Sequence, residues 1–129
     1  MKHEHWMPFP EEHDFPAATD YLSLIFSPKQ AEDLTTALKS AEVETKKAKD
    51  LLRSSGLEAL PKDNVHVRKD LDKIDKGELL SPVLLVRGSA PQGVGLIIAD
   101  GYHRICASYL LDEDADIPCL IVDYYRLVG

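Results

Sequence analysis

Cysteine is scarce in this chain, and long apolar runs and an excess of positive charge are absent. The two cysteines, Cys106 and Cys119, both lie within apolar patterns, which excludes a domain built on several disulfides and predicts buried, reduced thiols. No stretch of about 18 apolar residues occurs, so we expect no membrane span. These absences together favour a cytoplasmic protein.

The charge balance argues against nucleic acid as a partner. The 129 residues carry a formal net charge of -7, whereas surfaces that bind nucleic acid are basic or carry a basic stripe. Hydrophobic residues make up 44% of the chain and charged residues 29%, which is ordinary for globular proteins. No repeat or long linker divides the sequence, so we expect a single domain over residues 1–129.

A strand, a sharp turn and a helix are predicted around Asp100. The apolar run Leu96–Ala99 is typical of a strand that is covered on both faces. Asp100 is a good helix N-cap, and Gly101 allows the turn. After this turn, apolar side chains recur with the period of a helix that has one buried stripe, at Tyr102, Ile105, Cys106, Tyr109 and Leu110.

This helix start is a candidate phosphate site. A helix begins with unpaired N–H groups and the positive end of its dipole, and both favour anions. His103 and Arg104 lie in the first turn and add a titratable donor and a fixed cation. The same residues also have a purely local interpretation, in which Asp100 caps the helix, Gly101 makes the turn, and neither His103 nor Arg104 meets a ligand.

The run Asp100 to Tyr109, with the apolar segments Pro82–Val86 and Ile117–Val122 on either side, resembles the core of the ParB/sulfiredoxin-like superfamily. In that group, a strand ends in a turn of the Gly-x-His-Arg or Gly-x-x-Arg type, a helix follows, and a last strand begins near an Ile-Pro pair. The likeness covers about Val65 to Tyr124.

This resemblance implies that Gly101, Tyr102, His103 and Arg104 bind the phosphates of a nucleotide. In sulfiredoxins, the residue before the His-Arg pair is the catalytic cysteine. Here that position is Tyr102, so sulfinic acid reduction is not supported. The resemblance implies nothing about the N-terminal half of the chain.

The N-terminal half is predicted as an extended arm followed by helices. Residues 1–16 contain three prolines between aromatic residues, which suggests an arm that packs on the body. Residues 17–60 are predicted as a helical layer, with one helix over 17–26 and another starting at the Ser27-Pro28 pair. A break near 42–45 and a further helix that ends at Gly56 complete this layer.

The core over residues 65–124 is predicted to begin with a strand. Val65–Arg68 alternates as a strand would, which places His66 and Arg68 on one face and makes them candidates to stand behind the phosphate site. A single helical turn follows around Leu71 and Ile74. Further strands are predicted at Val83–Arg87, Val94–Ala99 and Ile117–Tyr124. The resulting fold class is α+β, with a small mixed sheet of about four strands.

Two charged runs are expected to be surface features of the fold. The basic residues are expected on the solvated face of a helix, although one of them could reach a phosphate: Lys46, Lys47, Lys49 and Arg53. The acidic run Asp112–Asp116 departs from a calcium loop at its sixth and twelfth positions. Its side chains are expected to face water or a basic partner, and no metal site is predicted.

Two main classes of function remain open. The first is a nucleotide- or phosphate-binding domain that carries out phosphoryl transfer or nucleotide hydrolysis, with His103 and Asp100 as the catalytic candidates and a nucleotide with Mg²⁺ as the cofactor. The second is a non-catalytic module that binds a protein partner on the same scaffold. A ParB-like nuclease is third, because the acidic balance opposes it.

Overall fold

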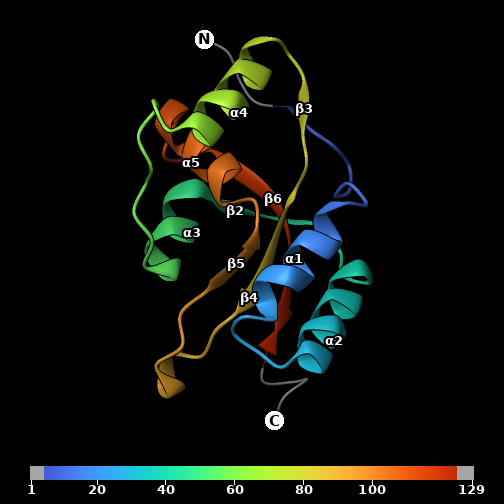
Figure 1. The fold of residues 1–129 in the computed structure, drawn as a ribbon. Coiled ribbons are helices and arrows are strands. Elements are labelled where there is room, and N and C mark those ends of the chain that lie inside the picture. Colours follow the sequence, from blue (N-terminus) through green and yellow to red (C-terminus); the bar gives the residue numbers. More distant parts are fainter. Residues whose placement is uncertain (1–4, 125–129) are drawn as a thin grey trace.

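The computed structural model describes residues 5–124, and these form an α+β fold with helices on both faces of a four-stranded sheet (Figure 1). The helices are α1 (Asp14–Leu22), α2 (Pro28–Lys39), α3 (Ala48–Ser55), α4 (Val65–Asp75) and α5 (Tyr102–Leu111), and a 3₁₀ turn spans Ala90–Gln92. The strands are β1 (His5–Trp6), β2 (Glu44–Lys47), β3 (Leu79–Leu80), β4 (Val83–Arg87), β5 (Ile97–Asp100) and β6 (Asp116–Asp123). Among the described residues, no helix has the length and apolar character to cross a bilayer.

Strand β4 is the centre of the mixed sheet, whose order is β2-β6-β4-β5. It pairs with β6 in parallel and with β5 antiparallel, and β2 pairs antiparallel with β6. Side chains alternate across a strand, so Val83 and Leu85 contribute to one hydrophobic cluster and Leu84 and Val86 to the other. The continuously apolar sequence of β4 therefore reflects burial on both faces.

The two faces of the sheet are covered by different helices. Helices α1 and α2 supply the buried side chains on one face, and α3, α4 and α5 supply those on the other. The predicted helical layer over residues 17–60 is therefore wrong as a single unit. Residues 44–47 within it form the edge strand β2, and α3 lies on the opposite face from α1 and α2.

The first helix begins earlier than predicted. Residues 1–4 of the expected arm lie outside the described residues, and β1 pairs in parallel with β3. Helix α1 starts at Asp14, inside the stretch assigned to the arm, with Pro16 in its first turn. Proline is tolerated there because the first N–H groups of a helix have no intrahelical acceptor. Phe15 is buried, as expected for an aromatic residue that packs on the body.

The start of α2 is confirmed in detail. The Ser27 hydroxyl accepts a hydrogen bond from the Gln30 backbone N–H at 3.2 Å, and the Gln30 side chain accepts one from the Ser27 N–H at 3.1 Å. This reciprocal arrangement is a capping box, and Pro28 takes the first helical position. At the other predicted boundary, Gly56 ends α3 with a φ of 74°.

The strand predicted at Val65–Arg68 is wrong, because these residues form the first turn of α4. The Asn64 side chain accepts hydrogen bonds from the backbone N–H groups of His66 and Val67, which fixes the helix start. The helix then continues through the segment that was predicted as a separate turn. His66 and Arg68 are about 200° apart around a helix, so they do not share a face as the strand prediction required.

Strand β2 was missed because it has no apolar side chain. All of its residues are exposed, and it lies at the edge of the sheet, where charged side chains discourage pairing with other chains. Lys47 pairs with Asp116 at 2.8 Å, and Lys49, at the start of α3, pairs with Asp114 at 2.5 Å. The acidic run therefore meets a basic partner, one of its two expected surroundings.

Both cysteines are buried, as predicted. Burial raises the pKa of the Cys106 thiol, and it raises the pKa of Cys119 to about 12. A thiol with a raised pKa holds little thiolate at neutral pH, and the thiolate is the reactive form. Cys106 and Cys119 thus act as small hydrophobic residues.

Candidate functional site

The predicted strand, turn and helix around Asp100 are present, but the cap differs from the prediction. Strand β5 ends at Asp100, Gly101 occupies the N-cap position with a φ of 106°, and α5 begins at Tyr102. Gly101 has no side chain that could cap the helix. Asp100 lies one position before the N-cap, and its carboxylate accepts a hydrogen bond from Arg104.

Glycine is required at position 101 for two reasons. Its positive φ lies in a region that residues with a side chain rarely adopt. A Cβ atom there would also lie 2.4 Å from Cγ1 of Val83 and 2.8 Å from Nη2 of Arg104. The turn therefore packs directly against the first residue of the central strand.

Arg104 joins two carboxylates from distant parts of the chain. Its Nη2 atom lies 2.9 Å from Oδ2 of Asp100, one helical turn away, and 3.6 Å from Oδ2 of Asp14 at the start of α1. The Arg104 side chain is only 16% exposed. The sequence predicted Arg104 as a phosphate ligand, whereas the structure gives it internal acceptors.

The Asp14 carboxylate is held by further donors. The Ser81 hydroxyl donates to Oδ2 of Asp14, and the same hydroxyl accepts a hydrogen bond from the Glu11 backbone N–H at 3.0 Å. Nε2 of His13 lies 3.3 Å from Oδ1 of Asp14. We refer to Asp14, Ser81, Asp100 and Arg104 as the arginine cluster. It connects α1 to the segment before β4 and to the β5–α5 turn.

Burial raises the pKa of the Asp100 carboxyl, and the Arg104 guanidinium opposes this rise. The negative charge of the nearby Asp14 carboxylate raises the pKa of Asp100 further. A pair of partly desolvated carboxylates therefore depends on one cation for its charge balance. Within residues 5–124, the Arg104 Nε atom is buried and has no hydrogen-bond partner.

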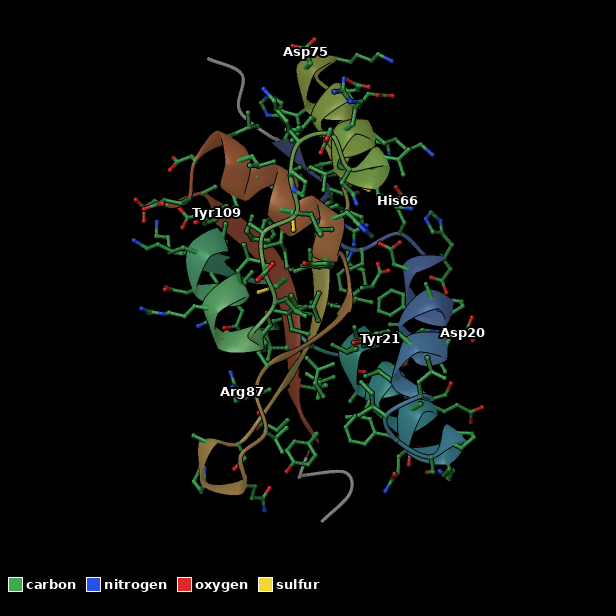
Figure 2. The ribbon with its side chains drawn as sticks, turned by 60° about the vertical axis from the view of Figure 1, so that its left-hand side comes forward. Asp20, Tyr21, His66, Asp75, Arg87 and Tyr109 are labelled. Atoms are coloured by element: carbon green, nitrogen blue, oxygen red, sulfur yellow. The ribbon has the colours of Figure 1, made fainter. Side chains whose placement is uncertain are left out.

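Two histidines come together at the start of α5. The rings of His66 and His103 lie with their centroids 4.7 Å apart, although the residues are 37 positions apart in sequence. Each histidine is the second residue of its helix, α4 or α5. Figure 2 shows His66 projecting from the end of α4 that packs beside α5. His66 thus lies beside His103, but it comes from a helix and not from the predicted strand.

Burial is the main cause that lowers the pKa of His103, and the neighbouring His66 and Arg104 lower it further. Asp70, on α4, acts in the opposite direction. Burial raises the pKa of Asp70 itself, and the charges of Arg104, Lys73 and both histidines oppose this rise. His103 therefore stays neutral at pH 7, with a carboxyl group close by.

The remaining predicted site residues are Tyr102 and Arg68, which differ in their surroundings from the histidine pair. The Tyr102 hydroxyl donates to the backbone carbonyl of Glu58, so its oxygen points to the segment before α4, although its ring lies 5.6 Å from that of His103. Arg68 is exposed on a different face of α4 from His66. The structure thus brings together Asp100, Gly101, His103, Arg104 and His66, and it leaves Arg68 outside.

Three residues at this site were not predicted from the sequence. Asp14 and Ser81 come from segments that contact α5 only through the tertiary fold, and Asp70 faces α5 because α4 replaces the predicted strand. The Asn64 cap, followed by Val67, Leu71 and Ile74 at spacings of four and three, was the available signal for α4.

Neither a metal cluster nor a related protein defines the site. In the described part of the chain, no group of three or more His, Cys, Asp or Glu residues is arranged to hold a metal ion. The chain matches no family model, no curated protein and no solved structure. The resemblance to the ParB/sulfiredoxin-like superfamily therefore stays a prediction.

The substitution Gly101→Ala is expected to destabilise the fold more than Gly56→Ala. Both positions have positive φ, which costs an alanine about 1–2 kcal/mol. Only at Gly101 does the new Cβ also meet a neighbour, and overpacking adds about 1–3 kcal/mol. Urea unfolding of both variants measures the difference. Equal losses of unfolding free energy would show that Val83 and Arg104 do not crowd this turn.

The substitution His66→Ala is expected to raise the pKa of His103. It removes a nearby positive charge and part of the cover over the ring, and both of these lower the pKa in the native protein. Asp70→Asn should lower the pKa further because it removes a negative charge. Arg68→Ala, on the same helix as His66, serves as the control and should leave the value unchanged.

The measurement is a titration of the His103 imidazole proton by NMR. In the native protein the midpoint should lie below the ordinary histidine value, so folding stability falls as the pH drops through that range, because the unfolded chain binds the proton more readily. A His103 pKa that does not respond to His66→Ala would contradict the proposed coupling of the two rings.

Proposed function

We propose that the start of α5 binds the phosphate group of a small molecule, with a nucleotide as the favoured class. The observation that carries this proposal is the pair of neighbouring rings, His66 and His103, whose planes are inclined at 44°, beside a helix whose N-cap residue has no side chain to cap it. Uncapped N–H groups and imidazole N–H groups are hydrogen-bond donors suited to phosphate oxygens.

The two helix starts differ in what they offer. At α4, the Asn64 side chain already accepts hydrogen bonds from the first N–H groups. At α5, the N-cap is Gly101, which has no side chain to do so. An anion that contacts both His66 and His103 therefore finds its backbone donors on α5, and the positive ends of both helix dipoles favour it.

Arg104 supports this site without being its main ligand. The guanidinium is mostly buried and is held by Asp14 and Asp100, so it fixes the turn that presents the α5 N–H groups. Part of its charge is neutralised by these carboxylates. This differs from the role that the sequence predicted, in which Arg104 contacts the phosphate directly.

If the site also hydrolyses a nucleotide, His103 is the residue suited to activate water. Its lowered pKa keeps the imidazole neutral near pH 7, which is the form that accepts a proton. Asp100 is less suited to this role because Arg104 occupies its carboxylate. A nucleotide would bring its own Mg²⁺, coordinated largely through its phosphates.

A second candidate function is protein binding, and an exposed apolar patch favours it. Tyr21, Leu24 and Ile25, at the end of α1 and just after it, are 45%, 84% and 50% exposed. Exposed large apolar side chains that lie close together are typical of interaction surfaces. This patch lies on different elements from the histidine pair.

The proposal is tested by isothermal titration calorimetry with ATP, ADP, CTP and inorganic phosphate, with and without Mg²⁺. We expect at least one of these ligands to bind. We expect His103→Ala and His66→Ala each to weaken binding by about tenfold or more, since a hydrogen bond to a charged group contributes about 1.5–3 kcal/mol. Binding should strengthen as the pH falls through the lowered pKa of His103, because the imidazole then gains a positive charge.

Arg68→Ala is the matched control, because it removes a cation from α4 without touching the histidine pair. It should leave the affinity unchanged. If no ligand produces heat above dilution at millimolar concentration, the nucleotide proposal fails and protein binding becomes the favoured function. The same outcome follows if the histidine variants bind as well as the native protein.

A further inference from the structure

A cavity of about 630 Å³ lies between α3 and the connection from β4 to β5. It shares no residue with the histidine pair or with the arginine cluster. Figure 2 shows Arg87, which lines the cavity, far from His66 at the start of α4. This volume falls in the range of pockets that bind small molecules.

The walls of the cavity are fixed by close backbone contacts. The Leu96 N–H donates a hydrogen bond of 3.0 Å to the Ser54 carbonyl, which ties the loop to the last turn of α3. Within the loop, Ser89 and Val94 exchange two backbone hydrogen bonds. A Cβ atom at Gly88 would lie 2.2 Å from the Val94 carbonyl oxygen, so the approach depends on glycine.

The lining is apolar at its base and mostly positive at its rim. Apolar side chains come from both walls: Leu51, Val94, Leu96 and Ile121. The charged residues that line it are three cations, Lys46, Arg53 and Arg87, and one carboxylate, Asp50. The residues that line the cavity thus include more cations than carboxylates, although the protein as a whole has a net charge of -7.

The cations differ in how firmly they are engaged. Arg87 pairs with Asp123 at 2.6 Å, and the Asp123 side chain is mostly buried. Arg53 pairs with Asp50 at 3.3 Å, and Lys46 pairs with Glu44 at 3.4 Å, with all four of these side chains well exposed. Exposed pairs contribute only about 0–1 kcal/mol, so Arg53 and Lys46 can exchange their partners for a ligand at little cost.

We propose that this cavity binds an organic carboxylate with an apolar body. The apolar base takes the hydrocarbon part, and Arg53 and Lys46 at the rim take the carboxylate. Arg53 already contacts the Asp50 carboxylate there, and a guanidinium matches two carboxylate oxygens well. This binding is separate from the phosphate proposal and does not depend on it.

The test uses octanoate as the probe, followed by NMR on the full chain. We expect saturable shifts confined to α3, the β4–β5 connection and the lining residues Lys46 and Ile121. Octanol, which has the same chain without the charge, should bind about twofold to fivefold more weakly than octanoate. Arg53→Gln should weaken the binding of octanoate by a similar factor, because an exposed ion pair contributes up to about 1 kcal/mol. Inorganic phosphate, which lacks the apolar body, should not produce these shifts.

The matched control is Lys49→Gln, because Lys49 lies on α3 but pairs with Asp114 outside the cavity. Lys49→Gln and His103→Ala should both bind octanoate as the native protein does. The proposal is overturned if octanoate fails to saturate at millimolar concentration, or if octanol binds equally well. It is also overturned if Arg53→Gln and Lys49→Gln weaken binding to the same extent.

Discussion

The ion pairs that Arg104 makes with Asp14 and Asp100 are the constraint on which the candidate site depends. They join the start of α1 to the turn between β5 and α5, two segments about 90 residues apart in sequence. A buried carboxylate is costly unless a positive charge and hydrogen bonds compensate for it. Arg104 compensates both the Asp14 and the Asp100 carboxylate. It therefore holds α1, on one face of the sheet, and α5, on the other, at the same β5–α5 turn.

This constraint also decides what the site can offer to a ligand. Arg104 is engaged, so the exposed chemistry at the start of α5 consists of the His66–His103 pair and the uncapped N–H groups. The lowered pKa of His103 follows from the same crowding, since the ring is partly buried beside a second histidine and a guanidinium. The cavity beside α3 is built from other elements, and two of its three cations, Lys46 and Arg53, belong to exposed ion pairs.

The sequence predicted what local patterns encode and missed what the tertiary fold assembles. The α+β class, the strand Val83–Arg87, the Ser27 cap and the strand–turn–helix at Gly101 all have local signals, and the structure contains them. The alternation of apolar and polar residues over Val65–Arg68 is typical of a strand, but these residues form a helix that Asn64 caps. Strand β2 has no apolar residue to reveal it. The contact between Arg104 and Asp14 depends on how the layers pack, which no local pattern records.

The most direct test of this account is a double-mutant cycle between Arg104 and Asp14, using Arg104→Gln, Asp14→Asn and the double variant. Unfolding free energies at neutral pH should be non-additive, with a coupling of about 1–3 kcal/mol, because either single variant already removes the ion pair between these two largely buried groups. Asp20→Asn, on the exposed side of α1, should show no coupling to Arg104. Additive losses for Arg104 and Asp14 would contradict the claim that their ion pair holds the site together.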